Sequence, residues 1–392
     1  MELKKITEGV WWAGAADWDR RLFDALVPLP DGTSYNAYLV KGTGKTALID
    51  TVDPTKTAVL MNHLEKVESL DYIISQHAEQ DHSGAIPEVL RKYPDAIVIT
   101  NSKGKEFLSD LLNVDGDRVR TVAEGEKLSL GGKTLEFIST PWVHWPETFS
   151  TFLREDRILF SCDLFGSHLA TTSVFVEDEW KAIEAAKRYY AEVMMPFRTT
   201  IRKHIEKFEQ FPVETIAPSH GPVYRNSEKI VMAHRDWVSE RVSNTVLLPY
   251  ATMHGSTELM VDYLTESLAS KGIGVQRFNL ATTDTGKLVM SLVDAASIVI
   301  GSPTVLTGAH PSVISAAFLV NALRPKLKFA SIIGSMGWGG KMVEQITATI
   351  ANLKVDLIAP VVVKGRPKED DYAALEKLAG EIAIRHRTNN IV

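Results

Sequence analysis

Four side chains that could bind a metal ion lie close together in the segment QHAEQDHSGAIP: His77, Glu79, Asp81 and His82. Alternate residues of an extended chain project to the same side, so His77, Glu79 and Asp81 could converge on one ion. The competing interpretation is a polar helix start, because Asp81 and Ser83 are good N-cap residues. This segment alone leaves both interpretations open.

Three further candidate ligands each follow a short apolar segment. They are His144 in TPWVHWPET, Asp163 in LFSCDLFG and His220 in APSHGP. A lone histidine is ordinarily a core or surface residue, but all three lie where layered α+β folds gather their sites, at strand ends that open into loops. The complete set of candidates favours a metal centre.

A second constellation, rich in hydroxyl groups, lies where the segment YATMHGSTELM leaves a strand and enters a helix. Backbone N–H groups, hydroxyls and the positive end of the helix dipole can hold a phosphate there. The turn contains neither GxxxxGK[ST] nor GxGxxG, so an ATP-binding loop is excluded and a dinucleotide is disfavoured. A monophosphate such as that of FMN fits better. The candidate residues are Thr252, Met253, His254, Gly255, Ser256 and Thr257.

Two more loops, GSPTVLTGAH (301–310) and GSMGWGG (334–340), also follow apolar strands. Open α/β sheets bind ligands at the carboxyl ends of their strands. Glycines let the backbone approach a flat ring, and Trp338 or Met253 could cover that ring. One Gly-rich turn is usually only a turn, but three at the correct strand ends predict a flavin site. The candidates in these loops are Ser302, Pro303, Thr304, Val305, Ser335, Met336, Gly337, Trp338, Gly339 and Gly340.

The strands and helices that must position these residues follow two different patterns along the chain, and the change between them falls near Arg241 to Val246. In the first part, strands and helices mix without strict alternation, which predicts an α+β layered domain over residues 1–245. The second part alternates strand and helix, which predicts a doubly wound parallel sheet over residues 246–392. The expected strands are 35–40, 46–50, 72–75, 96–100, 134–138, 150–153, 158–161 and 214–217, then 245–250, 275–280, 296–301, 329–334 and 355–363. The expected helices include 55–67, 84–92, 103–112, 178–193, 199–210, 226–243, 256–271 and 369–386.

Composition narrows the possible classes. With 392 residues, 45% hydrophobic and 23% charged, the chain is typical of a globular protein. No apolar run approaches the ~18 residues of a membrane span, and MELKKITEGV lacks the apolar segment of a signal peptide. A single cysteine, Cys162, excludes an internal disulfide, a CxxC pair and a rubredoxin-type centre, so we expect a cytoplasmic protein.

Charge is distributed unevenly along the chain. Residues 246–392 carry 14 basic and 12 acidic side chains, which leaves 29 basic and 37 acidic side chains before them. An acidic first part argues against a nucleic-acid-binding surface.

The spacing HxExDH…H…D…H resembles the metallo-β-lactamase fold, whose usual motif is HxHxDH. Glu79 stands where that motif has its second histidine, and a carboxylate there favours iron or manganese over zinc. Followed by a flavodoxin-like part, the chain closely resembles the flavodiiron proteins, or A-type flavoproteins. The resemblance covers nearly the whole chain through TSYNAYLV, HxExDH, VHWPET, FGSHLA, APSHG, YxTMxxST, GSPT and GxxGWGG, although His254 falls where relatives often have Trp.

The resemblance implies an αββα metallo-β-lactamase-like sandwich followed by a flavodoxin-like sheet. It implies two non-haem iron ions per chain that reduce dioxygen to water or nitric oxide to nitrous oxide. In its terms His77, Glu79 and His144 would hold one iron, Asp81, His82 and His220 would hold the other, and Asp163 would bridge them. Some members leave the histidine equivalent to His82 off the metal. His168 and Tyr190 match second-sphere positions that could donate hydrogen bonds or protons, although Tyr190 could equally be a core aromatic.

Further implications concern electrons and assembly. FMN would receive electrons from a separate donor: rubredoxin, a reduced deazaflavin or a reductase. The family implies a head-to-tail homodimer, or a dimer of such dimers, in which the FMN of one subunit lies beside the iron of the other. The sequence does not rank O2 against NO.

Two other functions remain open at this point. A zinc hydrolase with an appended flavodoxin module is disfavoured by Glu79, and a hydrolase has no evident need for FMN. An electron carrier or redox sensor with a vestigial metal site is disfavoured by the full set of candidate ligands. Metal analysis separates the hydrolase from the reductase, and turnover with O2 or NO separates the carrier.

Overall fold

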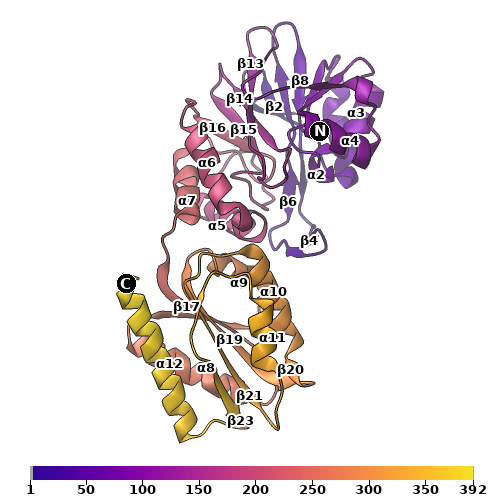
Figure 1. The fold of residues 1–392 in the computed structure, drawn as a ribbon. Helices are drawn as coiled ribbons and strands as arrows, with labels where there is room; N and C mark the ends of the chain where they lie inside the picture. The colour runs from indigo at the N-terminus through magenta and orange to yellow at the C-terminus, as the bar shows by residue number, and fades with distance from the viewer. Residues whose placement is uncertain (1–2, 392) are drawn as a thin grey trace. The chain divides into compact units, whose positions relative to one another are not determined.

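The computed structural model describes residues 3–391, which form two compact units, one ending at Val238 and the other beginning at Ser239 (Figure 1). Within residues 3–391, no helix combines the length and the apolar character that a membrane crossing requires.

The first unit is built on two sheets. The larger has the order β1-β2-β7-β8-β9-β10-β11 and the smaller has the order β12-β13-β14-β15-β16. Their bounds are β1 Lys4–Thr7, β2 Val10–Trp12, β7 Tyr38–Lys41, β8 Thr46–Ile49, β9 Tyr72–Ile74, β10 Ile97–Thr100 and β11 Val119–Thr121, then β12 Lys127–Ser129, β13 Thr134–Ser139, β14 Phe149–Leu153, β15 Ile158–Cys162 and β16 Thr215–Pro218. Val40 and Ile49 from the first sheet and Phe149 and Phe160 from the second share one buried apolar cluster. The two sheets therefore pack face to face.

Helices cover the outer faces of both sheets. Leu60, Val89 and Leu108 of the first helical layer pack against the larger sheet in a second apolar cluster. On the smaller sheet, Leu159 and Ile216 line one cavity together with side chains from two helices of the other layer. The layer order is helix, sheet, sheet, helix, which confirms the predicted αββα sandwich. The helices are α1 Thr57–His63, α2 Gln80–Ser83, α3 Ile86–Lys92 and α4 Ser102–Leu112, then α5 Glu179–Tyr189, α6 Arg198–Phe208 and α7 Glu228–Val238.

The expected strand 35–40 is wrong as a single element. β6 (Thr33–Tyr35) pairs with β3 (Ala15–Asp17), and the chain joins the large sheet only at Tyr38, where β7 begins. Asn36 causes the break, because its N–H donates to the carbonyl of Ser219 and its side-chain amide donates to Pro218 and Gly221. The segment holding Thr33 and Ser34 is thereby tied to the loop that carries His220.

The second unit is a parallel sheet with the order β18-β17-β19-β21, continued by β22 and β23, which both pair with β21. In chain order this is the 2-1-3-4-5 arrangement of flavodoxin-like sheets. The helices lie on both faces, with α8 and α12 on one face and α9, α10 and α11 on the other (Figure 1). The bounds are β17 Ser243–Tyr250, α8 Ser256–Ser270, β18 Gly274–Asn279, α9 Thr285–Ser291, β19 Ala295–Val305, α10 Pro311–Leu323, β21 Phe329–Met336, α11 Met342–Thr349, β22 Asp356–Leu357, β23 Val361–Lys364 and α12 Glu369–Thr388.

One expected strand of this unit is also wrong. The apolar run 355–363 forms two short strands, β22 and β23, separated by Ile358, Ala359 and Pro360. A proline cannot donate to a sheet ladder, so the pairing with β21 stops and then resumes at Val361.

Candidate metal and flavin sites

The seven candidate metal ligands sit at the ends of four strands of the first unit. His77 and Glu79 follow β9, and Asp81 and His82 lie on the short helix α2 that comes next. The remaining three are His144 after β13, Asp163 directly after β15 and His220 after β16. Each of them thus lies in a segment that follows the end of a short strand.

One half of the cluster gathers around Glu79. Its Oε2 lies 3.0 Å from Nε2 of His77 and 3.1 Å from Nε2 of His144. Oδ2 of Asp163 lies 3.7 Å from each of the same two nitrogens. Two imidazoles and two carboxylates therefore converge on one point.

The other half gathers around Asp81. Its carboxylate oxygens lie 3.2 Å from Nε2 of His220 and 3.4 Å from Nε2 of His82. Oδ1 of Asp163 lies 3.3 Å and 3.2 Å from these two nitrogens. The structure thus brings all seven residues together as two groups, and the two oxygens of Asp163 face one group each.

The donor set fits a pair of cations. All four carboxylate oxygens of Asp81 and Asp163 are buried and, among the described residues, have no hydrogen-bond partner. A buried carboxylate without a partner is costly, and a bound metal ion removes that cost. Four ligands, two with nitrogen and two with oxygen donors, surround each point, which suits iron better than an all-nitrogen set would.

Electrostatics lead to the same conclusion. Burial opposes charge on His220, yet Asp163 and Asp81 raise its pKa to about 10. Burial likewise opposes charge on His82, but Asp163 and Asp81 raise its pKa to about 9. The carboxylates therefore draw protons onto the histidines, and a metal ion would replace those protons.

Backbone and side-chain acceptors fix the ring orientation of two histidines. Nδ1 of His77 donates to Glu147 over 2.7 Å, and the same carboxylate accepts the N–H of Ala78 at 3.0 Å. Nδ1 of His220 donates to the carbonyl of Ser34 over 2.8 Å. In both rings Nε2 is left free to face the cluster, an arrangement typical of metal-binding histidines.

Sequence reasoning missed Glu147. Its only signal was its place in VHWPET, three residues after His144. It missed Asp50 as well, which follows β8 and is buried. Asp50 accepts hydrogen bonds from the N–H and the side-chain amide of Gln76, at 2.8 and 2.9 Å, and from Ser219 at 3.4 Å. Asp50 thus ties together the residues that precede His77 and His220.

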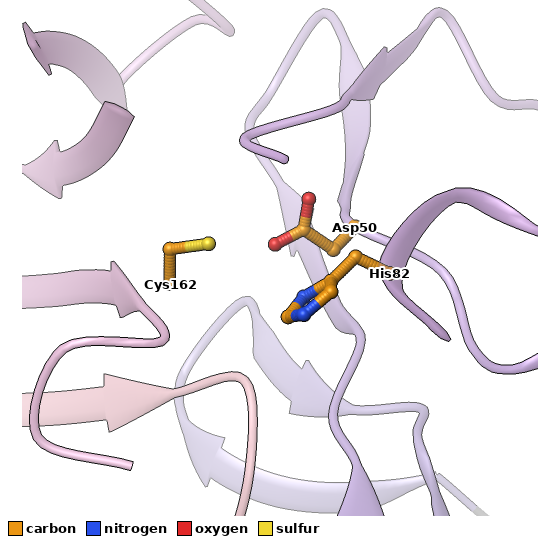
Figure 2. Close-up of side chains that lie close together, drawn as sticks. All are labelled: Asp50, His82 and Cys162. Atoms are coloured by element: carbon orange, nitrogen blue, oxygen red, sulfur yellow. The ribbon is translucent and has the colours of Figure 1, made fainter. Parts of the chain in front are cut away.

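A smaller polar group lies behind the metal candidates. Figure 2 shows the carboxylate of Asp50 pointing toward the thiol of Cys162, with the ring of His82 beside it. Burial, and then the charges of Asp163 and Asp50, raise the pKa of the Cys162 thiol well above its ordinary value. A protonated, buried thiol fits a small core side chain and not a metal ligand.

His168 lies next to the cluster, with its ring centroid 5.2 Å from that of His220. Its Nδ1 is 2.9 Å from Oγ1 of Thr33, and its buried Nε2 has no partner among the described residues. Burial, and then the neighbouring His220, lower the pKa of His168 well below its ordinary value.

The tyrosine beside His168 is Tyr189. Its ring centroid lies 4.8 Å from that of His168 and 5.8 Å from that of His220. The ring of Tyr190 packs instead against His234 and Trp237, at 6.0 and 5.6 Å. Consecutive helical residues point about 100° apart, so only one of the pair can face the cluster. The geometry assigns the position expected for Tyr190 to Tyr189.

The three candidate flavin loops meet at one edge of the second sheet. β17 and β19 are adjacent although β18 lies between them in the chain, which makes their carboxyl ends the switch point where such sheets bind ligands. Thr257, at the start of α8, lies 3.2 Å from Ser335 at the end of β21, measured between their hydroxyl oxygens. The phosphate candidates of one loop thus contact the candidates of another.

The turn before α8 is shaped by Gly255, whose φ of 82° favours glycine and whose N–H donates to the Thr252 hydroxyl. A side chain added at Gly255, Gly337 or Gly339 would meet open space. Met253 and Trp338 are 52% and 95% exposed, and His254 is exposed too. The edge therefore offers backbone N–H groups and two exposed hydrophobic side chains to a ligand.

Other candidate flavin-binding residues already form hydrogen bonds or strand pairs within the chain. The hydroxyl of Ser302 accepts the N–H of His310 and donates to the carbonyl of Pro303. Thr304 and Val305 belong to the end of β19, which pairs with β20 (Gly308–Ala309). Sequence reasoning did not single out the loop that contains Gly365. The N–H of Gly365 donates to the carbonyl of Met336, so this loop lies at the same edge of the sheet.

Comparisons with known proteins agree with this arrangement. Residues 33–221 match a family model described as ODP family beta lactamase. A coenzyme F420H(2) oxidase of Methanothermobacter marburgensis is 34% identical, over 97% of this chain and 98% of its own. A nitric oxide reductase of Moorella thermoacetica is 33% identical over the same shares. The solved structure of rubredoxin oxygen:oxidoreductase from Desulfovibrio gigas superimposes with a TM-score of 0.95, at 29% identity and over 100% of both chains.

Proposed function

Because the chain belongs to the flavodiiron family, also called A-type flavoproteins, we propose that it reduces dioxygen to water, nitric oxide to nitrous oxide, or both. The observation that carries the proposal is the convergence of the other six ligand candidates around the buried carboxylate of Asp163, whose oxygens have no hydrogen-bond partner among the described residues. The zinc-hydrolase alternative is disfavoured, since the relatives are named as oxidoreductases.

In this proposal His77, Glu79 and His144 hold one iron, Asp81, His82 and His220 hold the other, and Asp163 bridges them. Bound iron would supply the affinity for O2 or NO and would pass on to it the electrons that arrive through FMN. Glu147 and the Ser34 carbonyl hold the rings of His77 and His220 so that Nε2 of each faces a metal. His168 and Tyr189 border the His220 side and can offer an N–H and an O–H to the substrate.

The approach of the substrate follows from exposure. The side chains of His144 and Glu79 retain 18% and 13% exposure, whereas those of His77 and Asp163 retain none. O2 or NO would therefore reach the centre on the side of His144 and Glu79. The buried ligands on the other side keep water from the carboxylates, which strengthens their hold on the metal.

In the second unit, Ser256, Thr257 and the start of α8 would hold the phosphate of FMN, and the loops after β19 and β21 would contact its ring. FMN supplies a carrier that accepts electrons from a donor and passes them on. The donor is a separate molecule: rubredoxin, a reduced deazaflavin or a reductase. A single cysteine suits a reducing compartment, so the proposed location is the cytoplasm.

The direct test is anaerobic purification from an iron-replete source, quantification of metal and flavin, and measurement of O2 and NO consumption with several donors. The expected result is two iron ions and one FMN per chain, with turnover of at least one gas. Glu79→His should shift the occupancy toward zinc and abolish turnover. A zinc-only protein of unmodified sequence that was fully active would overturn the proposal.

Assembly is part of the proposal, because the two sites belong to separate units. We propose a head-to-tail homodimer in which the FMN of one subunit serves the metal centre of the other. The negative first part and the slightly positive second part of the chain favour such a pairing.

Complementation tests this assembly. One chain would carry His77→Ala with His144→Ala, and the other Ser256→Ala with Thr257→Ala. Each homodimer should be inactive, and mixed dimers should regain turnover. If the mixture stays inactive although mixed dimers form, transfer between subunits is refuted.

A further inference from the structure

The neighbours of His168 fix the position and the orientation of its imidazole ring. The question that remains is which of the two ring nitrogens carries the proton. Three aromatic rings pack around its imidazole, with centroids at 4.8 Å for Tyr189, 5.1 Å for Phe23 and 5.2 Å for His220. The imidazole is buried at both nitrogens' ends, with the whole residue 7% exposed. A ring packed on several sides cannot exchange its two nitrogens by flipping without displacing these neighbours.

Thr33 is the only described residue with a hydrogen bond to this ring, through Oγ1 at 2.9 Å from Nδ1. The hydroxyl has one hydrogen, which can go to Nδ1 or to the carbonyl of Ser34 at 3.4 Å. The Ser34 carbonyl is the poorer choice, because it is farther away and already accepts the 2.8 Å bond from Nδ1 of His220. The Thr33 hydroxyl therefore donates to Nδ1 of His168.

A nitrogen that accepts a hydrogen bond carries no proton, so the proton of His168 is on Nε2. We propose that Thr33 is a positioning residue that holds His168 in its Nε2–H form. Nε2 lies on the side of the ring opposite Nδ1, is buried, and has no partner among the described residues. The N–H at Nε2 of His168 is therefore available to donate a hydrogen bond.

What this donor would meet follows from its surroundings. Besides Tyr189, whose ring packs against His168, the groups that act on it electrostatically include His220, Asp163, Glu79 and His82, and these four are proposed ligands. An N–H without a protein partner, beside the proposed metals, would donate to an oxygen atom of O2 or NO when the gas binds. This inference rests on the proposed function, but the proton position itself does not.

The test measures the proton position without turnover. Full-length protein loaded with diamagnetic zinc and labelled with 15N at histidine would be examined by NMR, with His168→Gln used to assign the signals. We expect one tautomer for His168, with Nδ1 as the acceptor and hydrogen on Nε2. Thr33→Ser should keep that tautomer, and Thr33→Val, which has similar volume but no hydroxyl, should give a mixture. Hydrogen on Nδ1 in the unmodified protein overturns the proposal.

Activity supplies a second, separate readout on the iron- and FMN-loaded enzyme. Thr33→Val should lower kcat about 10-fold or more with KM for the gas unchanged, and Thr33→Ser should restore kcat. A fall caused only by lost iron, which Thr33→Ser also shows, would mean a merely structural role and would refute the proposal. If Thr33→Val does not fold, the spectra of the unmodified protein and of Thr33→Ser still decide. An inactive enzyme with the expected tautomer would count against the reductase function alone.

Discussion

The two units solve the problem of binding a cofactor in opposite ways. In the first unit the site is made of buried, charged side chains from four strand ends, and the oxygens of Asp81 and Asp163 have no hydrogen-bond partner among the described residues. In the second unit the site is made of turns, hydroxyls and glycines along one sheet edge, and its hydrophobic side chains are exposed. A metal site demands particular residue types, whereas a flavin site demands a backbone shape. We therefore expect metal binding to be lost when one charged ligand is removed, whereas the affinity for flavin should fall gradually as single contacts are removed.

The largest effect is expected at Asp163, which lies between the two groups of ligands. Asp163→Asn removes the charge that both groups share, so we expect loss of iron and of all reductase turnover. FMN content should not change, because that site lies in the other unit. Asp156→Asn, at a carboxylate paired with Lys133, is the matched control and should keep iron. Normal iron content in Asp163→Asn would show that the centre does not depend on this carboxylate.

The second unit should respond more gradually. Ser256→Ala with Thr257→Ala removes two hydroxyls from the start of α8, and each hydrogen bond to a charged group is worth about 1.5–3 kcal/mol. Together the two losses should raise the FMN dissociation constant by about a hundred- to ten-thousandfold, as measured by flavin titration, while iron stays bound. Thr265→Ala with Ser270→Ala, farther along α8, should leave the affinity unchanged. If FMN binds the first double variant normally, the phosphate lies elsewhere.

A smaller loss is expected from Glu147, which touches a proposed ligand and not a metal. Glu147→Gln weakens the acceptor of the His77 Nδ1–H, and such outer contacts are worth about 10- to 100-fold in metal affinity. Competition with a chelator would measure it, with Glu155→Gln as a control on the same unit. Equal chelator resistance in both variants would mean that His77 needs no orienting carboxylate.

The smallest effect concerns stability in acid. Burial lowers the pKa of His234 to about 3, so the folded protein leaves this ring neutral where the unfolded chain protonates it. The unfolded state then binds the extra proton between about pH 6.5 and 3, and stability falls as the pH falls through that window. The loss at pH 5 is about 2 kcal/mol.

His234→Leu removes this term. Between pH 8 and pH 5 the free energy of unfolding of the variant should gain about 2 kcal/mol on that of the unmodified protein, as measured by urea unfolding of the first unit. His254→Leu, at an exposed histidine of the second unit, should show no such change. Parallel pH profiles for His234→Leu and the unmodified protein would mean that His234 is not buried in its neutral form.

The sequence predicted most of the fold because its apolar runs matched strands and helices closely, as at 72–75 and 256–271, which form β9 and α8. It failed where a polar side chain or a proline interrupted an apolar run, as Asn36 and Pro360 do. The short N-terminal hairpins were also missed, since strands as brief as β4 (Leu22–Phe23) and β5 (Val27–Pro28) carry no periodicity.

The same contrast holds for the sites. The histidines and carboxylates of HxExDH could be read directly, because few roles require that spacing. Glu147 and Asp50 could not, since a single acidic residue in a loop is usually a solvated one. The choice between Tyr189 and Tyr190 depends on helix rotation where α5 passes into a π-helix at Tyr190–Met194, and no residue type signals that change.

The burial of Cys162 has a practical consequence for a protein proposed to handle oxygen. The chain has one sulfhydryl, and it is wholly enclosed and protonated, so neither peroxide nor alkylating reagents can reach a reactive thiolate in the native state. Oxidative wear should therefore spare it until the first unit opens. The rate at which iodoacetamide alkylates Cys162 in the native protein therefore measures how often the first unit opens, and it needs no engineered probe.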